Sequence, residues 1–246
     1  MGAMDADVGS SPSEVDGAGG AGAGVDDASE TDLDEGEVRG GLSWAKVAVL
    51  GVALAFLGFA VGVFVTRDRP PGADSADVGF LQDMISHHEQ AIEVSRLVEQ
   101  YGEDPTVRSF ATDVLGVQSY EIGVMTEKLR RWGFTPSDRS DEAMAWMDMP
   151  VPVDQMPGRL TDEEMAEISQ VRGTELDQLF LENMAEHHRG GIHMAQAATQ
   201  LVDDDDIRAM AERMVRNQSS EINEYRGTAQ TLGFDIDIEP APVPSS

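Results

Sequence analysis

Two stretches of the sequence, FLQDMISHHEQAI at Phe80–Ile92 and FLENMAEHHRGGI at Phe180–Ile192, align with each other at an offset of 100 residues. The same offset aligns two further pairs of segments without a gap: QSYEI (118–122) with QSSEI (218–222), and WGF (132–134) with LGF (232–234). Matches at three separate places with one fixed period indicate an internal repeat. This part of the chain therefore contains two copies of one unit.

Apolar residues recur at helical spacing within each copy. In the first copy one stripe, through Phe80, Leu81, Met84 and Ile85, and a second, which begins at Val107, both fit an i, i+3, i+4 spacing. The turn between the stripes is GEDP at 102–105, and its counterpart is DDDD at 203–206, where acidic residues suit the N-terminus of the following helix. Each copy is predicted to be a helical hairpin, and two hairpins predict an all-α four-helix bundle.

The predicted boundaries follow from these patterns. The first hairpin repeat is 79–134, the Met-rich crossover is 135–160, the second repeat is 161–234, and 235–246 is a flexible tail. Thr161 and Glu164 offer a capping box for an extra helix that leads into the second repeat. No segment carries a strand pattern, so we expect no strand.

A long apolar run precedes the repeats. VAVLGVALAFLGFAVGVFV at 47–65 contains 19 residues without a charge, and as a helix it would span about 28 Å, which matches a hydrocarbon core. We predict a retained transmembrane helix at 44–66 and a linker at 67–78. A cleaved signal peptide is disfavoured because no small-residue cleavage site follows the run. Basic residues flank it equally on both sides, which leaves its orientation open.

Composition excludes several classes of function. The first 43 residues are mainly Gly, Ala, Ser and acid, and such a stretch is predicted to be a disordered tail. The chain has 46 Asp and Glu against 17 Lys and Arg, which leaves no basic surface for nucleic acid. The absence of cysteine excludes disulfides, thiolate zinc sites, iron–sulfur clusters and a cysteine nucleophile. No nucleophilic triad, phosphate loop or dinucleotide fingerprint is visible.

A methionine and two histidines recur in each copy as Met-x-x-His-His. Helix positions i, i+3 and i+4 share one face, so the thioether and both imidazoles of a copy can converge on one ion. The motif residues are Met84, His87 and His88 in the first copy and Met184, His187 and His188 in the second. Because these motifs hold four of the chain's five histidines, a metal site is favoured over core packing.

The second helix of each copy carries further polar positions at i, i+3 and i+7. These are Gln118, Glu121 and Met125 in the first copy and Gln218, Glu221 and Tyr225 in the second. A bundle would point them at the Met-x-x-His-His face, which Met194 extends in the second copy. Glu121 and Glu221 are expected to orient the histidine rings, or to cap the bundle interior, rather than to bind metal directly.

The donor types favour copper. Di-iron bundles carry Glu-x-x-His, whereas here methionine stands where that glutamate would be. Thioether and imidazole donors suit copper, above all Cu(I). In the crossover, Met144, Met147 and Met149 surround a tryptophan, and they form either a further Cu(I) site or a hydrophobic plug. His193 is out of phase with the histidine pair and is expected at the surface or in a separate weak site.

Over residues 77 to 234 the chain resembles the bacterial domain of unknown function 305 family. The resemblance is carried by the paired M-x-x-H-H segments, the downstream Q-x-x-E-I, and the segments FLENMAEHH and HMA. The resemblance implies a ferritin-like fold, export or membrane anchoring, and an association with copper. Carried over position by position, it implies these ligands: Met84, His87, His88, Met125, Met184, His187, His188 and Met194. Tyr225 stands opposite Met125 and Val94 opposite Met194, so the two copies are expected to differ in affinity.

The leading hypothesis is a single-pass membrane protein with an extracytoplasmic domain that buffers or hands on copper, without turnover. One alternative is a non-catalytic accessory subunit of a membrane complex, for which Gly58 and Gly62 could form a helix-pairing face. Another is a two-metal oxidase, against which the missing Glu-x-x-His argues. A membrane-protein partner and a homo-oligomer both stay open.

Overall fold

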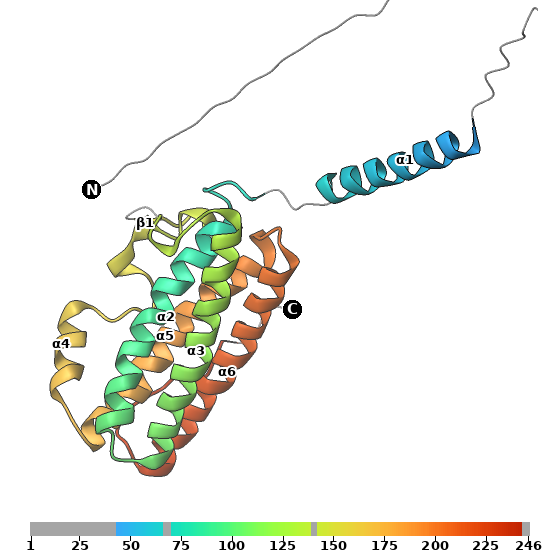
Figure 1. Ribbon diagram of the computed structural model, residues 1–246. Helices are drawn as coiled ribbons and strands as arrows, with labels where there is room; N and C mark the ends of the chain where they lie inside the picture. Colours follow the sequence, from blue (N-terminus) through green and yellow to red (C-terminus); the bar gives the residue numbers. More distant parts are fainter. Residues whose placement is uncertain (1–42, 66–69, 139–141, 243–246) are drawn as a thin grey trace, which may run out of the picture. The chain divides into compact units, whose positions relative to one another are not determined.

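Four long helices form two antiparallel hairpins (Figure 1). The computed structural model describes residues 43–65, 70–138 and 142–242. The bundle consists of α2 (Ala76–Tyr101), α3 (Pro105–Trp132), α5 (Thr174–Leu201) and α6 (Asp205–Leu232). Helix α2 packs against α3, α5 packs against α6, and α2 and α5 pack against each other. The predicted four-helix bundle of two tandem hairpins is confirmed.

The hairpin turns are closed by the residues that the sequence marks. Asp104 caps α3 by accepting hydrogen bonds from two backbone N–H groups, and Asp204 caps α6 in the same way. Helices α3 and α6 end at Gly133 and Gly233, whose φ values of 85° and 72° lie in the left-handed region that glycine adopts without strain. The two copies thus share their start and stop signals.

Each hairpin also closes the turn of the other. The buried carboxylate of Asp77, in the first turn of α2, accepts a hydrogen bond from the backbone N–H of Asp204 (2.9 Å). The buried carboxylate of Asp177, in the first turn of α5, accepts one from the backbone N–H of Asp104 (2.7 Å). The start of α2 therefore lies beside the end of α5, so these two central helices run antiparallel.

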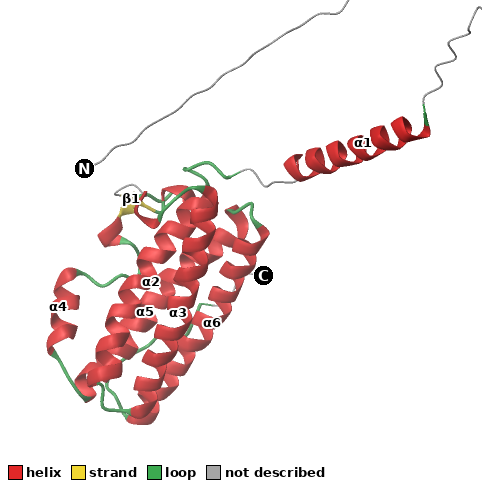
Figure 2. Cartoon of the chain, viewed as in Figure 1, coloured by secondary structure: helices red, strands yellow, loops and turns green. Residues whose placement is uncertain are grey.

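The crossover contains a short ladder that the sequence analysis did not predict. Strands β1 (Glu142–Ala143) and β2 (Val151–Pro152) pair antiparallel, and the short 3-10 helices η1 (Pro136–Asp138), η2 (Ala145–Met147) and η3 (Val153–Gln155) accompany them. The expectation of no strand was wrong because two-residue strands are too short to leave an alternating pattern. The extra helix α4 (Asp162–Gln170) is confirmed (Figure 2). The capping box between Thr161 and Glu164 has both of its hydrogen bonds.

Side chains of α2 hold the crossover against the bundle. Buried Asp83 accepts hydrogen bonds from the backbone N–H of Met144 (2.7 Å) and the indole N–H of Trp146 (2.9 Å). Buried Gln90 donates to the carbonyl of Leu160 (2.8 Å) and accepts from its N–H (2.7 Å). The crossover therefore has a fixed position along α2.

The helix α1 (Trp44–Val65) belongs to a separate unit of the chain. Its stretch Trp44–Gly62 is long and apolar enough to cross a membrane, and its described side chains are exposed. The predicted acidic tail lies outside the described residues except for Ser43. Part of the predicted flexible tail, 235–242, is described: Ile238 is buried there, and the carbonyl of Pro240 accepts a hydrogen bond from Arg189.

Candidate metal centre

The two copies of the histidine motif meet at the interface of α2 and α5. The rings of His87 and His187 lie 3.7 Å apart between centroids, at an interplanar angle of 33°. His88 and His188 lie one position further along their helices, with ring centroids 6.4 Å and 6.2 Å from those of their neighbours. All four rings are buried. The internal repeat thus brings four imidazoles into one region of the core.

The Nε2 atom of every ring faces an oxygen. His187 donates to the carbonyl of His87 (3.0 Å), and His87 donates to the carbonyl of Pro157 in the crossover (3.3 Å). The carboxylates of Glu121 and Glu221 stand 2.8 Å and 2.7 Å from Nε2 of the outer histidines, His88 and His188. Carbonyl and carboxylate oxygens accept, so the ring proton is assigned to Nε2.

In this tautomer the other ring nitrogen, Nδ1, carries a lone pair. Within the described part of the chain, none of these four buried Nδ1 atoms has a hydrogen-bond partner. Buried polar atoms in proteins are almost always paired, so four orphans in one region require an explanation. A lone pair on a neutral imidazole is the donor that binds a transition metal. The chemistry of these atoms fits a metal ion.

Burial keeps the central histidines, His87 and His187, in the neutral form, which is the form that can bind a metal ion. Desolvation holds the pKa of His87 and His187 well below the ordinary value, and neighbouring positive groups lower it further. Burial is the largest single influence on Glu221 and raises its pKa, but the hydrogen bond with His188 and the charge interactions with His188 and His88 together leave that pKa lowered. The core thus holds neutral central imidazoles, and at Glu221 an ionised acceptor beside an outer ring.

The predicted methionines separate into two groups. Met84, Met125, Met184 and Met194 are fully buried in the same core as the histidines. In the crossover, Met144 is buried, Met147 is half-buried and Met149 is 48% exposed. His193 is half-buried. The motif methionines therefore share the histidines' environment, whereas the crossover methionines range from the core to the surface.

Oxygen and nitrogen donors alone do not complete a metal site. No group of three or more His, Asp or Glu side chains is arranged to hold one ion in residues 43–65, 70–138 and 142–242. The two glutamates already accept hydrogen bonds from His88 and His188. The other potential ligand type that the described core contains is the sulfur of its buried methionines.

Sequence reasoning missed the backbone contacts that orient the central rings. A Cβ on Gly190 would lie 1.9 Å from the carbonyl oxygen of Pro157, so only glycine lets the crossover approach α5 here. Gly158, with φ 81°, turns the chain at this point. The sequence did contain a signal for this close approach, because the second copy has Gly190 in the segment HRGGI where the first copy has Gln90.

The second copy differs from the first at the outer histidine. The phenolic oxygen of Tyr225 lies 3.3 Å from Nε2 of His188, at the position that Met125 occupies in the first copy. Burial raises the pKa of Tyr225, so the phenol stays protonated. His188 therefore has two polar neighbours at Nε2, whereas His88 has a methionine at the corresponding helix position.

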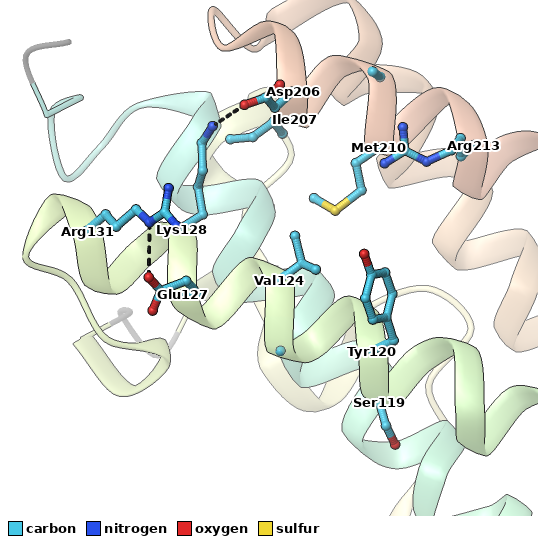
Figure 3. Close-up of a pocket in the computed structure, with 12 residues that line it drawn as sticks. Ser119, Tyr120, Val124, Glu127, Lys128, Arg131, Asp206, Ile207, Met210 and Arg213 are labelled. Atoms are coloured by element: carbon cyan, nitrogen blue, oxygen red, sulfur yellow. Dashed lines mark hydrogen bonds and ion pairs between the residues drawn. The ribbon is translucent and has the colours of Figure 1, made fainter. Parts of the chain in front are cut away.

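One open hollow lies away from the histidines, between α3 and α6. Its volume is about 640 Å³, and none of the predicted ligands lines it. Figure 3 shows Tyr120 and Val124 of α3 on one side and Met210 and Arg213 of α6 on the other. This hollow is open surface between two helices rather than part of the candidate metal centre.

The model of the domain of unknown function 305 family (DUF305) matches residues 77–229, which is more than half of the chain. The chain belongs to the DUF305 family. A DUF305 protein from Streptomyces coelicolor has 36% identity and a TM-score of 0.62, and the match covers 66% of this chain and 96% of that one. A DUF305 fragment from Deinococcus radiodurans has 26% identity and a TM-score of 0.54, covering 63% and 96%.

CopM in the Cu(I)-bound form also matches this DUF305 chain, at 21% identity and a TM-score of 0.49, covering 63% of this chain and 96% of that one. No curated protein matches the chain. The ferritin-like helical fold that the sequence resemblance implied is confirmed by the DUF305 structures.

Proposed function

We propose that this DUF305 protein binds copper as Cu(I) in the bundle core and either buffers it or hands it on, without turnover. The observation that carries the proposal is the set of four buried Nδ1 atoms of the motif histidines, none of which has a hydrogen-bond partner among the described residues. Cu(I) is the ion that combines imidazole with thioether ligands, whereas hard divalent ions take carboxylates and water.

The surroundings of the outer histidines support the same assignment. A histidine that binds a metal usually donates its other N–H to a carboxylate or carbonyl, which fixes the ring and raises its basicity. Glu121 and Glu221 occupy that position behind His88 and His188, and carbonyl oxygens occupy it behind His87 and His187. The acceptors are in place, and each leaves Nδ1 free for an ion.

The proposed ligands are the motif residues of both copies. Sulfur comes from four methionines that are fully buried in the hydrophobic core of the bundle. The copies bind with unequal affinity, because the second has Tyr225 instead of Met125 and gains Met194. The proposed set is Met84, His87, His88, Met125, Met184, His187, His188 and Met194.

We place this function at a membrane, with the bundle on the extracytoplasmic side. Support comes from the stretch Trp44–Gly62, which has the length and apolar character of a membrane span. In a membrane preparation of the full chain, the protein is expected to stay with the membranes after an alkaline carbonate wash. Release into the wash would contradict an integral anchor.

The test is Cu(I) affinity of the full chain in detergent micelles, measured by competition with a chromophoric Cu(I) chelator. In the test variant, Met84→Leu and Met184→Leu are combined, which keeps apolar volume but removes sulfur. We expect this variant to lose at least about tenfold in affinity, a magnitude typical of changes around a metal site. The control is Met210→Leu, because Met210 is buried outside the motif.

A second variant keeps the proposal open to contradiction if the first changes little. His87→Gln with His187→Gln removes both central imidazoles and leaves polar side chains of similar length. Loss of copper binding with unchanged helical circular dichroism supports the proposal. Copper binding equal to that of the unmodified chain in both variants would make these residues core packing and overturn it.

A further inference from the structure

Helices α3 and α6 approach each other less closely than the other neighbouring helices of the bundle. We call the boundary between α3 and α6 the α3–α6 seam. Besides the hollow of Figure 3, two further cavities lie along it. The outer hollow, about 410 Å³, is lined by Gly116, Val117, Tyr120, Glu121, Arg213 and Asn217, among others. It is open to solvent and lies on the same side of the bundle as the two glutamates that face the outer histidines.

A much smaller inner cavity lies next to the outer hollow. Its volume is about 10 Å³, which is roughly the space that one water-sized sphere needs. Three residues, Val117, Glu121 and Asn217, line both spaces, so the two adjoin. A water molecule or a single ion thus fits between the open hollow and the interior.

Five oxygen-bearing side chains line the inner cavity, and besides Asn217 they form two matched pairs from the two copies. These are Gln118 and Glu121 of α3 with Gln218 and Glu221 of α6. Both glutamines are more than nine-tenths buried, and their Oε1 atoms have no hydrogen-bond partner in the described part of the chain. A Cβ on Gly191 would lie 2.5 Å from Oε1 of Gln218, so this amide reaches inward from α6 to α5. The Oε1 atoms of the two buried glutamines can therefore accept a hydrogen bond or coordinate a cation.

The glutamates connect this cavity with the histidines. Their side chains keep 13% and 24% exposure while they accept hydrogen bonds from His88 and His188. Each carboxylate thus lies between the solvent-facing seam and a buried imidazole. A cation that reaches the inner cavity would stand directly outside the outer rings.

We propose that the α3–α6 seam is the path by which a metal cation enters the core, and that the inner cavity is a transient oxygen-lined stop on this path. The inference rests on the proposed copper function and adds the route to it. Carboxylate and amide oxygens attract a cation but hold Cu(I) weakly, because Cu(I) prefers sulfur and nitrogen donors. Weak binding at the stop allows the ion to move on to the deeper donors.

Two exposed glycines on α3 provide a matched pair of variants for the test. Gly116 lines the outer hollow, and Gly123, two helical turns along the same helix, lines the hollow of Figure 3, which does not reach Glu121. At both positions a Cβ would meet nothing within 4 Å. Gly116→Phe therefore fills the mouth of the proposed path, whereas Gly123→Phe adds the same bulk in the neighbouring hollow, which shares Tyr120 and Arg213 with the outer hollow but does not reach Glu121.

The experiment measures the rate of Cu(I) transfer from a weak chelator to the full chain in detergent micelles by stopped-flow absorbance. We expect Gly116→Phe to slow loading at least about tenfold, within the range by which access changes association rates, while the equilibrium affinity stays unchanged. Gly123→Phe is expected to load at the rate of the unmodified chain.

A third variant tests the stop itself. Gln118→Leu with Gln218→Leu removes both unpartnered oxygens and leaves the histidine hydrogen bonds intact. We expect slower loading at unchanged equilibrium affinity.

The outcomes separate the route from the function. If the unmodified chain binds Cu(I), and both Gly116→Phe and the glutamine variant load as fast as it does, the entry path is overturned and the copper function stands. If the unmodified chain binds no Cu(I) at equilibrium, both proposals fail. Slower loading with equal affinity in Gly116→Phe, but not in Gly123→Phe, supports the path.

Discussion

At the scale of single residues, the hydrogen bonds from His88 and His188 to their glutamates give a direct test of how the core binds copper. A charged acceptor behind a ligand imidazole strengthens its donation to a metal. Replacing both acceptors, Glu121→Gln and Glu221→Gln, keeps an accepting oxygen but removes the charge. We expect Cu(I) affinity to fall about 10- to 100-fold, measured by chelator competition.

The control for this pair is Glu224→Gln, since Glu224 is exposed on α6, the same helix as Glu221. Its affinity should equal that of the unmodified chain. An undiminished affinity in the double variant would show that the carboxylates do not act on copper through the rings.

The sequence predicted much of this residue-level arrangement. The sequence analysis expected Glu121 and Glu221 to orient the histidine rings or to cap the bundle interior, and both stand within hydrogen-bond distance of a ring. The carbonyl partners of His87 and His187 could not be predicted, because backbone oxygens leave no mark in side-chain identity. The unpartnered oxygens of the buried glutamines were missed for a similar reason: a Gln at a helix position does not reveal which of its atoms is satisfied.

At the scale of elements, the turns between helices depend on Asp77 and Asp177. Each carboxylate is buried and accepts hydrogen bonds from the backbone of the opposite hairpin's turn. Asp177→Ala leaves those N–H groups without their acceptor, so we expect the free energy of unfolding to fall by about 1–3 kcal/mol, measured by urea denaturation. Asp205→Ala, at an exposed first-turn position of α6, should change it much less.

The approach of the crossover to α5 gives a second prediction at this scale. A Cβ on Gly190 would overlap the carbonyl of Pro157, whereas a Cβ on Gly227 of α6 would meet nothing within 4 Å. Gly190→Ala should therefore lower the melting temperature and displace the crossover. Gly227→Ala should raise stability by about 0.5–1 kcal/mol, because alanine favours an exposed helix interior. Equal melting temperatures for the two variants would contradict this packing.

Elements with strong local signals were predicted well from the sequence. The hairpin helices carry long apolar stripes and acidic caps, and the capping box of Thr161 and Glu164 marks α4. The ladder of β1 and β2 was not predictable, because its position depends on contacts between the crossover and α2, such as those of Asp83. Tertiary contacts, not local preference, fix that segment.

At the scale of the whole molecule, buried neutral histidines make the stability of the metal-free bundle depend on pH. In the unfolded chain a histidine has a pKa of about 6.5. In the folded chain the pKa of His87 and His187 lies well below that value. Below about pH 6.5 unfolding therefore takes up protons, and the free energy of unfolding falls by up to about 1.4 kcal/mol per pH unit for each histidine.

Urea denaturation of the metal-free protein at pH 7.5 and at pH 5.5 checks this prediction. The bundle should be less stable at the lower pH, and the His87→Gln, His187→Gln variant should lose less stability between the two. A variant as sensitive to pH as the unmodified chain would place the effect on other groups.

The reciprocal closure of the turns by Asp77 and Asp177 has a consequence for the origin of the molecule. Neither hairpin is complete by itself, since the acceptor for its turn is supplied by the other hairpin. A lone copy could be completed only by a second identical copy, related to it by a twofold axis through the stacked histidines. The present chain therefore has the arrangement that fusion of the two subunits of a homodimer would produce, with the crossover as the join between them.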